Sequence, residues 1–360
     1  MTHFFNSKTL KAFFLLNFLF ISIFLTAQIP AGYYDDAIGK SDTALQIALH
    51  NIIKGHNAVG YGNVPNHHQT TDKKSNGKVW DMYSDIPGGT PPYQFTFITD
   101  KCGNYSQEGD CYNREHSFPQ SWFGSNEPMQ SDLFHVYPTD GYVNGKRSNW
   151  PFAEVDNPTW TSQNGSKLGP SASAGYSGTG FEPIDEYKGD FARTYFYMAV
   201  RYYSEDNSWE NNSMVDGSQL KPWALQQLYL WHLQDTVSQK EIDRNNAVYQ
   251  IQGNRNPFID RPDWVDSLWF PAPPPNAMNE IQNNDFQLFP NPTSEKLTLK
   301  FSEPIEARLR VRDMQGRLIT EMPVEQQTET LSVENLCDGI YYIELQSANF
   351  YMVRKFVVKR

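Results

Sequence analysis

The segment NREHSFP at residues 113–119 places a guanidinium, a carboxylate and an imidazole on consecutive residues. Two further polar segments follow it, SDLFHVYP at residues 131–138 and GYVNGKRSN at residues 141–149. Each segment is weak evidence alone, because a Glu-His pair is frequent and a single histidine is usually a surface residue or a hydrogen-bonded core residue. Together they decide the interpretation of the chain, since they supply complementary chemical groups in close succession.

These groups suit the hydrolysis of a phosphodiester. A neutral imidazole, whose ordinary pKa is about 6.5, can take a proton from water at physiological pH, so His116 is the candidate general base. Mg²⁺ prefers oxygen ligands and often uses only one or two protein groups, so Glu115 and Asn144 are the candidate metal ligands. Mn²⁺ or Ca²⁺ can occupy the same kind of site. Lys146 and Arg147 can bind phosphate groups, and Arg147 is the second candidate catalytic residue.

The order of Glu115 and His116 sets a geometric condition. Adjacent residues on a regular strand point to opposite faces, so the two side chains can serve one site only where the strand ends or bulges. Pro119 favours a break shortly after them.

The body of the chain combines helices with irregular segments. Apolar spacing predicts helices from Asp42 to Gly55 and at residues 192–204 and 222–235. The aromatic stripes of the last two are expected to belong to the core. Long stretches rich in glycine and asparagine fill much of residues 140–182.

A proline-rich segment, PAPPPNAMN from residue 271, favours an extended spacer and marks a domain boundary. Short runs with an apolar residue at every second position follow it, and they predict a small β-sandwich without catalytic groups. The runs are KLTLKF at 296–301, ARLRVRD at 307–313, YYIELQ at 341–346 and MVRKFVV at 352–358.

The first residues have the layout of a secretory signal peptide. Lys8 and Lys11 precede an apolar run from Ala12 to Ala27 that ends in small residues. We expect a signal peptide at residues 1–27, with an uncleaved membrane anchor as the alternative. No internal apolar run is long enough to span a bilayer, so we expect no stable membrane insertion after cleavage.

The chain has three cysteines, so one must be unpaired within the chain. Cys102 and Cys111 can close a small loop just before the Glu-His segment in an oxidising compartment, or can remain as two buried thiols. Cys337 is expected to be a small buried apolar residue of the C-terminal domain.

The chain resembles the bacterial endonuclease I family, periplasmic and secreted nucleases with a ββα-metal active site. The resemblance runs from about residue 33 to residue 262, on NREHSFPQSW, SDLFHVYPTDGYVNGKRSN, ARTYFYM at 192–198 and IQGNRNPFID at 251–260. It implies that His116 is the general base and that Glu115 and Asn144 hold Mg²⁺. If the metal also binds the 3′ leaving oxygen, we expect the products to carry 5′-phosphate ends.

The chain departs from the family pattern in two places. Some members carry an arginine that stabilises the cleaved phosphate between the Glu-His motif and the following aspartate, but residues 123–131 contain none. Arg147 or Arg114 is the candidate replacement. Phe134 stands where some members have a histidine, and His135, which follows it, is expected to form supporting hydrogen bonds rather than to act as a base.

The charge of the chain is unusual for a protein that binds nucleic acid. Residues 28–280 carry 18 Lys and Arg against 30 Asp and Glu, a net charge of −12, and the whole chain carries −11. A broad basic surface normally accompanies nucleic-acid binding. Any such site is therefore expected to be a local patch around a cation.

The tail resembles the C-terminal sorting domain that the type IX secretion system recognises. The resemblance covers residues 284–360, on LFPNPTSEKLTL at 288–299, LCDGIYYIEL at 336–345 and the basic end MVRKFVVKR. It implies export through the periplasm to the medium or the cell surface, with the type IX machinery as a partner.

We therefore expect an α+β fold: a mixed nuclease domain with a ββα-metal motif at residues 28–270, a linker at 271–283, and a β-sandwich sorting domain at 284–360. The expected function is a secreted, metal-dependent endonuclease that cuts DNA, and also RNA, without sequence specificity. The alternatives are an inactive secreted nucleic-acid-binding or surface protein on the same scaffold, and another metal hydrolase. The absence of HExxH and GxSxG motifs argues against a peptidase.

Overall fold

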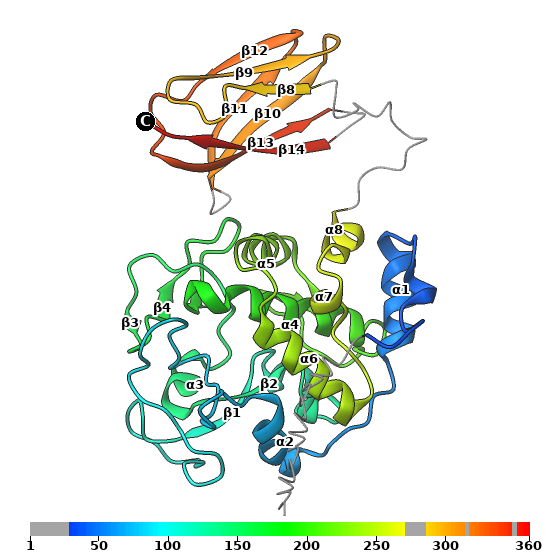
Figure 1. Cartoon of the computed structure of the whole chain (residues 1–360), viewed down its shortest axis with the longest axis vertical. Coiled ribbons are helices and arrows are strands. Elements are labelled where there is room, and N and C mark those ends of the chain that lie inside the picture. Colours follow the sequence, from blue (N-terminus) through cyan, green and yellow to red (C-terminus); the bar gives the residue numbers. More distant parts are fainter. Residues whose placement is uncertain (1–28, 271–285, 314–316, 348–350) are drawn as a thin grey trace, which may run out of the picture.

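The computed structural model describes residues 29–270, 286–313, 317–347 and 351–360, with the side chain of Tyr351 left out (Figure 1). The predicted signal peptide and the predicted linker at 271–283 lie outside the described residues. Helices and short sheets make up the first body, and strands make up the second, so the predicted α+β class is confirmed. Within the described ranges, no helix has the length and apolarity needed to cross a membrane.

The first body, residues 29–270, is mostly helical. Its helices are α1 (Asp42–Ile53), α2 (Val64–Thr71), α3 (Gly141–Arg147), α4 (Lys188–Arg201), α5 (Pro222–Gln234), α6 (Gln239–Gln252), α7 (Pro257–Asp260) and α8 (Trp264–Trp269). Single 3₁₀ turns are η1 (Asp35–Ala37), η2 (Tyr61–Asn63), η3 (Gln120–Phe123), η4 (Met129–Ser131) and η5 (Asp185–Tyr187). The helices predicted from Asp42 to Gly55 and at residues 222–235 are confirmed as α1 and α5.

Small antiparallel sheets complete this body. The strands are β1 (Tyr112–His116) with β2 (Val136–Asp140), β3 (Trp160–Thr161) with β4 (Lys167–Pro170) and β5 (Thr179–Glu182), and β6 (Val215–Asp216) with β7 (Gln219–Leu220). Helix α3 begins directly after β2, so β1, β2 and α3 form a ββα unit (Figure 1).

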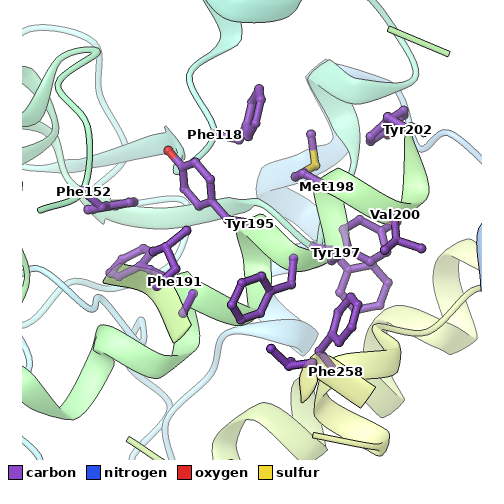
Figure 2. Close-up of a cluster of buried hydrophobic side chains, with 14 of the residues drawn as sticks. Phe118, Phe152, Phe191, Tyr195, Tyr197, Met198, Val200, Tyr202 and Phe258 are labelled. Atoms are coloured by element: carbon purple, nitrogen blue, oxygen red, sulfur yellow. The ribbon is translucent and has the colours of Figure 1, made fainter. Parts of the chain in front are cut away.

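Helix α4 runs through the core of this body, and all its residues from Lys188 to Arg201 are buried. Figure 2 shows its aromatic side chains packed against Phe118, Phe152 and Phe258 from other segments. The expectation that the aromatic stripe at 192–204 is core is therefore confirmed, although the helix begins and ends a few residues earlier. A buried helix must pair its charged groups, and the Arg193 guanidinium donates to Glu241 on α6 at 2.8 Å.

The second body is a β-sandwich of two antiparallel sheets. One sheet has the order β12 (Thr328–Ser332), β9 (Lys296–Phe301), β8 (Phe286–Phe289); the other has β11 (Leu318–Val324), β10 (Ala307–Asp313), β13 (Gly339–Gln346), β14 (Tyr351–Val358). All four predicted runs lie on strands, and the side chains of Leu297, Leu299, Leu309 and Val311 are fully buried between the sheets. Alternation places every second residue in the core, as expected for two packed sheets.

Cys337 corrects one expectation. Its thiol is exposed rather than buried, because the residue lies in the turn that leads into β13 and not on the inward face of a strand.

A buried carboxylate holds the irregular segment before β2 against the helices. Asp132 is fully buried, and its Oδ2 accepts hydrogen bonds from Tyr197 at 2.8 Å and from Tyr202 at 2.9 Å. Gln252 of α6 donates to Oδ1 at 3.0 Å, and the His56 ring lies 3.8 Å from Oδ2. Burial by itself raises the pKa of Asp132, but the charge interactions with His56 and His135, together with the hydrogen bonds, outweigh burial and lower the pKa to about 2.

We expect acid to destabilise the fold through Asp132. Since the folded-state pKa lies below the unfolded value, this group stabilises the fold above about pH 4, and the effect is lost as the pH falls through about 2. The loss should amount to about 2 kcal/mol, measured by urea unfolding across that pH range. In Asp132→Asn this part of the pH dependence should disappear, whereas Asp36→Asn, which changes an exposed carboxylate, should keep it; equal slopes for Asp132→Asn and the parent would contradict the assignment.

Candidate active site

The ββα unit brings the three polar segments of the sequence together. Strands β1 and β2 pair so that Glu115 lies opposite Tyr137 and His116 opposite Val136. The side chain of Asp140 caps α3 by accepting a hydrogen bond from the Val143 backbone N–H at 2.8 Å. Helix α3 therefore starts at a fixed point and carries Asn144 back over β1.

The geometric condition on Glu115 and His116 is met by the end of a strand. Strand β1 ends at His116, and both side chains line one cleft of about 320 Å³. The lining residues are Tyr61, Cys102, Gly103, Asn113, Arg114, Glu115, His116, Pro119, Gln120, Asn144, Ser148 and Asn149.

Glu115 is held by one of its two oxygens. Its side chain is almost fully buried, and Oε1 accepts a hydrogen bond from the Tyr83 hydroxyl at 2.8 Å. The Arg147 guanidinium lies 3.2 Å from the same oxygen. Burial raises the pKa of Glu115, while Arg147 and Tyr83 act in the opposite direction. Among the described residues Oε2 has no partner, so this oxygen is available to a ligand in the cleft.

Asn144 is held in a similar way. Its Nδ2 donates to the Asn113 Oδ1 at 2.7 Å and to the Arg114 carbonyl at 3.2 Å. A backbone carbonyl can only accept, so the amide nitrogen must face β1 and Oδ1 must face away from it. Asn144 Oδ1 has no partner within the described part of the chain.

His116 is held by one ring nitrogen. Its Nε2 lies 3.0 Å from the Gln130 carbonyl, so Nε2 carries the proton and donates it to that acceptor. Burial lowers the pKa of His116 to about 3, and His135, Arg114 and Arg147 add to this effect against the Gln130 hydrogen bond. The ring is therefore neutral at physiological pH, and Nδ1 is a free acceptor with no partner in the described ranges.

The two oxygens on Glu115 and Asn144 fit a hard divalent cation. Mg²⁺ commonly keeps several waters and takes one or two protein oxygens besides the substrate phosphate, which matches this donor set. Throughout the described ranges, no group of three or more His, Cys, Asp or Glu side chains is arranged to hold a metal.

Arg147 lies behind the cleft rather than in it. The guanidinium is about 1% exposed, and it donates to the His116 carbonyl at 2.9 Å and to the Ser117 carbonyl. The Tyr195 hydroxyl of α4 lies 3.2 Å from it. Its donors are thus directed at Glu115, at the backbone that follows β1 and at α4, and it does not line the cleft.

Arg114 is the arginine that lines the cleft. Its guanidinium lies 3.5 Å from the centre of the Tyr61 ring and donates to the Tyr61 carbonyl at 2.7 Å. Lys146 instead lies over the rings of Tyr142 and Trp160 and is not among the lining residues.

Two further expectations have clear outcomes. Cys102 and Cys111 form a disulfide, which leaves Cys102 at the edge of the cleft. His135 is fully buried and its Nε2 lies 2.7 Å from the Met129 carbonyl, so it supports the segment beneath the His116 ring and does not reach the cleft.

Sequence analysis did not identify Tyr83 and Tyr195, which hold Glu115 and Arg147. They come from segments 32 and 48 residues away from those partners, and although Tyr195 stands in the ARTYFYM motif, nothing near either residue indicates its partner. Asn113, the partner of Asn144, stands inside the NREHSFP segment, but its type and position do not predict that contact.

The Endonuclease I family model matches residues 41–263. The chain belongs to the endonuclease I family. As a member of this family it is a hydrolytic nuclease, and members generally depend on a metal ion. A second family model, the secretion system C-terminal sorting domain, matches residues 287–359. This endonuclease I protein is therefore secreted or displayed at the cell surface.

Curated relatives agree with this assignment. The chain is 37% identical to an extracellular ribonuclease of Bacillus amyloliquefaciens over 246 residues, 66% of this chain and 78% of the relative. An extracellular ribonuclease of Bacillus subtilis is 34% identical over 245 residues, with the same shares covered. A periplasmic deoxyribonuclease of Aeromonas hydrophila is 25% identical over 134 residues, 37% of this chain and 48% of the relative.

We expect this endonuclease I protein to depend on Arg147 for stability. Arg147→Ala leaves the Glu115 carboxylate buried without its cation, so the free energy of unfolding should fall by about 3–5 kcal/mol. Arg147→Lys keeps the positive charge but not the planar guanidinium, so its free energy of unfolding should fall by less than that of Arg147→Ala. Urea unfolding measures both, with Arg261→Ala at an exposed ion pair as the control. A loss below about 1 kcal/mol in Arg147→Ala would contradict the role described here.

Proposed function

We propose that this protein is a secreted endonuclease that hydrolyses phosphodiester bonds of DNA and RNA without sequence specificity and leaves 5′-phosphate ends. One observation carries the proposal. Glu115 Oε2, Asn144 Oδ1 and His116 Nδ1 belong to side chains that line one cleft, and each side chain is fixed through its other polar atom. Sites that position reacting groups in advance in this way need little rearrangement during the reaction.

The proposed ligands of a Mg²⁺ ion are Glu115 and Asn144. When bound, the ion would neutralise the phosphate and stabilise the leaving oxygen. His116 Nδ1 would accept a proton from the attacking water, and the Nε2 proton would remain on its hydrogen bond to the Gln130 carbonyl. Arg147 is proposed to position Glu115 and the end of β1 rather than to touch the substrate.

Arg114 is proposed to bind a phosphate next to the cleaved bond. It is the cationic side chain among the cleft residues, and Tyr61 holds its guanidinium in place. Binding through phosphates positions the nucleic acid but does not read its sequence. The names of the relatives include a ribonuclease and a deoxyribonuclease, which supports a proposal of both substrates.

We expect His116→Ala to lose about 10²- to 10⁴-fold of the cleavage rate, because a positioned general base contributes about that much. The assay is nicking of supercoiled plasmid, in parallel with cleavage of RNA, a small phosphodiester and casein, with Mg²⁺ or with excess chelator. Added imidazole should restore part of the activity of His116→Ala, which it would not do for a side chain with a purely structural role.

The control is His67→Ala, which changes a partly exposed histidine outside the cleft. A loss smaller than tenfold in a folded His116→Ala protein would remove His116 from the proposed role. An inactive but folded parent that still binds nucleic acid would favour the alternative of an inactive binding protein.

We expect Arg114→Ala to weaken the binding of duplex DNA and to make that binding less sensitive to salt. Each phosphate contact that is lost should lower the slope of log affinity against log salt by about 0.9. Fluorescence anisotropy in chelator, between about 50 and 200 mM salt, measures the slope without cleavage. Arg261→Ala, outside the cleft, should keep the parental slope; an unchanged slope in Arg114→Ala would exclude its phosphate contact.

A further inference from the structure

Helix α3 carries a glycine one residue after Asn144 and another one turn earlier. Gly141 and Gly145 are four residues apart and therefore lie on the same side of the helix. The ring of Tyr105 lies against both. A Cβ on Gly141 would be 2.6 Å from Tyr105 Cδ1, and a Cβ on Gly145 would be 2.9 Å from the Tyr105 hydroxyl oxygen. Only glycine at these positions lets the ring approach the helix so closely.

Tyr105 belongs to a loop that is fastened to the same helix. The Cys102–Cys111 disulfide closes this loop. The Gly109 N–H donates to Asp140 Oδ2 at 2.8 Å, while the other oxygen of Asp140 caps α3. The Gly141 N–H also donates to the Cys111 carbonyl at 2.9 Å. The disulfide closes the loop, and two hydrogen bonds hold it against the start of α3.

The edge of the Tyr105 ring lies against Gly141, and its hydroxyl end lies against Gly145. In the described residues its hydroxyl has no hydrogen-bond partner, and the residue is 36% exposed. The Tyr105 side chain therefore acts on α3 through van der Waals contact with the two glycines and not through a hydrogen bond. The ring therefore restricts how α3 can shift against the loop.

We propose that Tyr105 is a positioning residue for the metal ligand Asn144, and that its ring holds α3 at the distance where Asn144 Oδ1 faces Glu115 across the cleft. The inference rests on the proposed function, because it takes Asn144 as a ligand. Within the described residues, two hydrogen bonds to β1 are what otherwise fix the Asn144 side chain. Residues that orient metal ligands typically change metal affinity about 10- to 100-fold when they are replaced.

The first test measures metal binding without catalysis. Binding of Mn²⁺ to the full chain is followed by electron paramagnetic resonance, and thermal unfolding is followed beside it. We expect Tyr105→Ala to bind Mn²⁺ about tenfold more weakly while remaining folded, and Tyr105→Phe, which keeps the ring, to bind it as the parent does. In the cleavage assay, Tyr105→Ala should need more Mg²⁺ for half-maximal rate, with a smaller change in kcat at saturating Mg²⁺.

The second test uses the glycine. On helix propensity alone, Gly145→Ala should stabilise α3, by up to about 1 kcal/mol. We instead expect it to weaken Mn²⁺ binding several-fold, because the new Cβ would meet the Tyr105 hydroxyl and displace the ring. Adding Tyr105→Phe removes that oxygen, the nearest atom, and should restore part of the binding, since the ring carbon Cε2 would still lie 3.2 Å from the new Cβ. Gly62→Ala, where the new Cβ would meet open space, is the matched control.

The outcomes separate the two proposals. If Asn144→Ala does not weaken Mn²⁺ binding by the parent protein, the proposed metal site fails and the role of Tyr105 fails with it. If Asn144→Ala abolishes binding but Tyr105→Ala binds Mn²⁺ as tightly as the parent, only the role of Tyr105 is overturned. If Gly145→Ala binds Mn²⁺ as tightly as the parent, the contact of Tyr105 with α3 is likewise excluded as a restraint on Asn144.

Discussion

A buried ion pair between Glu115 and Arg147 is the interaction on which the site depends. A carboxylate so deep in the protein is costly unless a cation and hydrogen bonds compensate it. Arg147 provides the cation from the last turn of α3, and its two terminal nitrogens donate to the backbone carbonyls directly after Glu115. Tyr195 connects the same guanidinium to the central helix α4. Strand β1, helix α3 and the core are thus joined at one charged group, and the end of β1 has little freedom to move.

The two polar atoms of each of the three motif side chains have different surroundings. Glu115, Asn144 and His116 line one cleft, and each uses one polar atom to bind protein while the other has no partner in the described residues. A ligand that meets such groups finds them already oriented. Under the proposed function, an acidic body with a net charge of −12 can still bind nucleic acid, because the proposed substrate-binding groups are local and fixed.

Much of this could be predicted from sequence, where local pattern and local structure agree. Helices α1 and α5 and strands β9 and β10 follow their apolar periodicity closely. Helix α6 does not, because its buried face includes Asn245 and Asn246, so periodicity hides it. The start of α6 nevertheless has a sequence signal, because Ser238 and Glu241 have the spacing of a capping box and form one.

In the candidate site, too, some features could be predicted from the local sequence and others could not. Motif residues could be selected because their chemistry is visible in the sequence, although the roles given to them remain proposals. Sequence also suggested Arg147 as a phosphate ligand, whereas its burial directs it at Glu115; burial depends on segments far along the chain and cannot be deduced from the motif itself. Cys337 was misjudged for a related reason, because a small apolar residue in a turn has no alternation to indicate which way it faces.

The short ββα unit has a further consequence for how the protein reaches its folded state. Its hydrogen bonds join residues separated by only about thirty positions, such as Arg114 with Asn144 and His116 with Arg147. The entropy lost in closing a loop grows with the logarithm of its length, so short closures are the less costly ones. The residues that line the cleft can therefore meet through contacts within one compact stretch of chain, and the distant Tyr83 and Tyr195 then complete their enclosure.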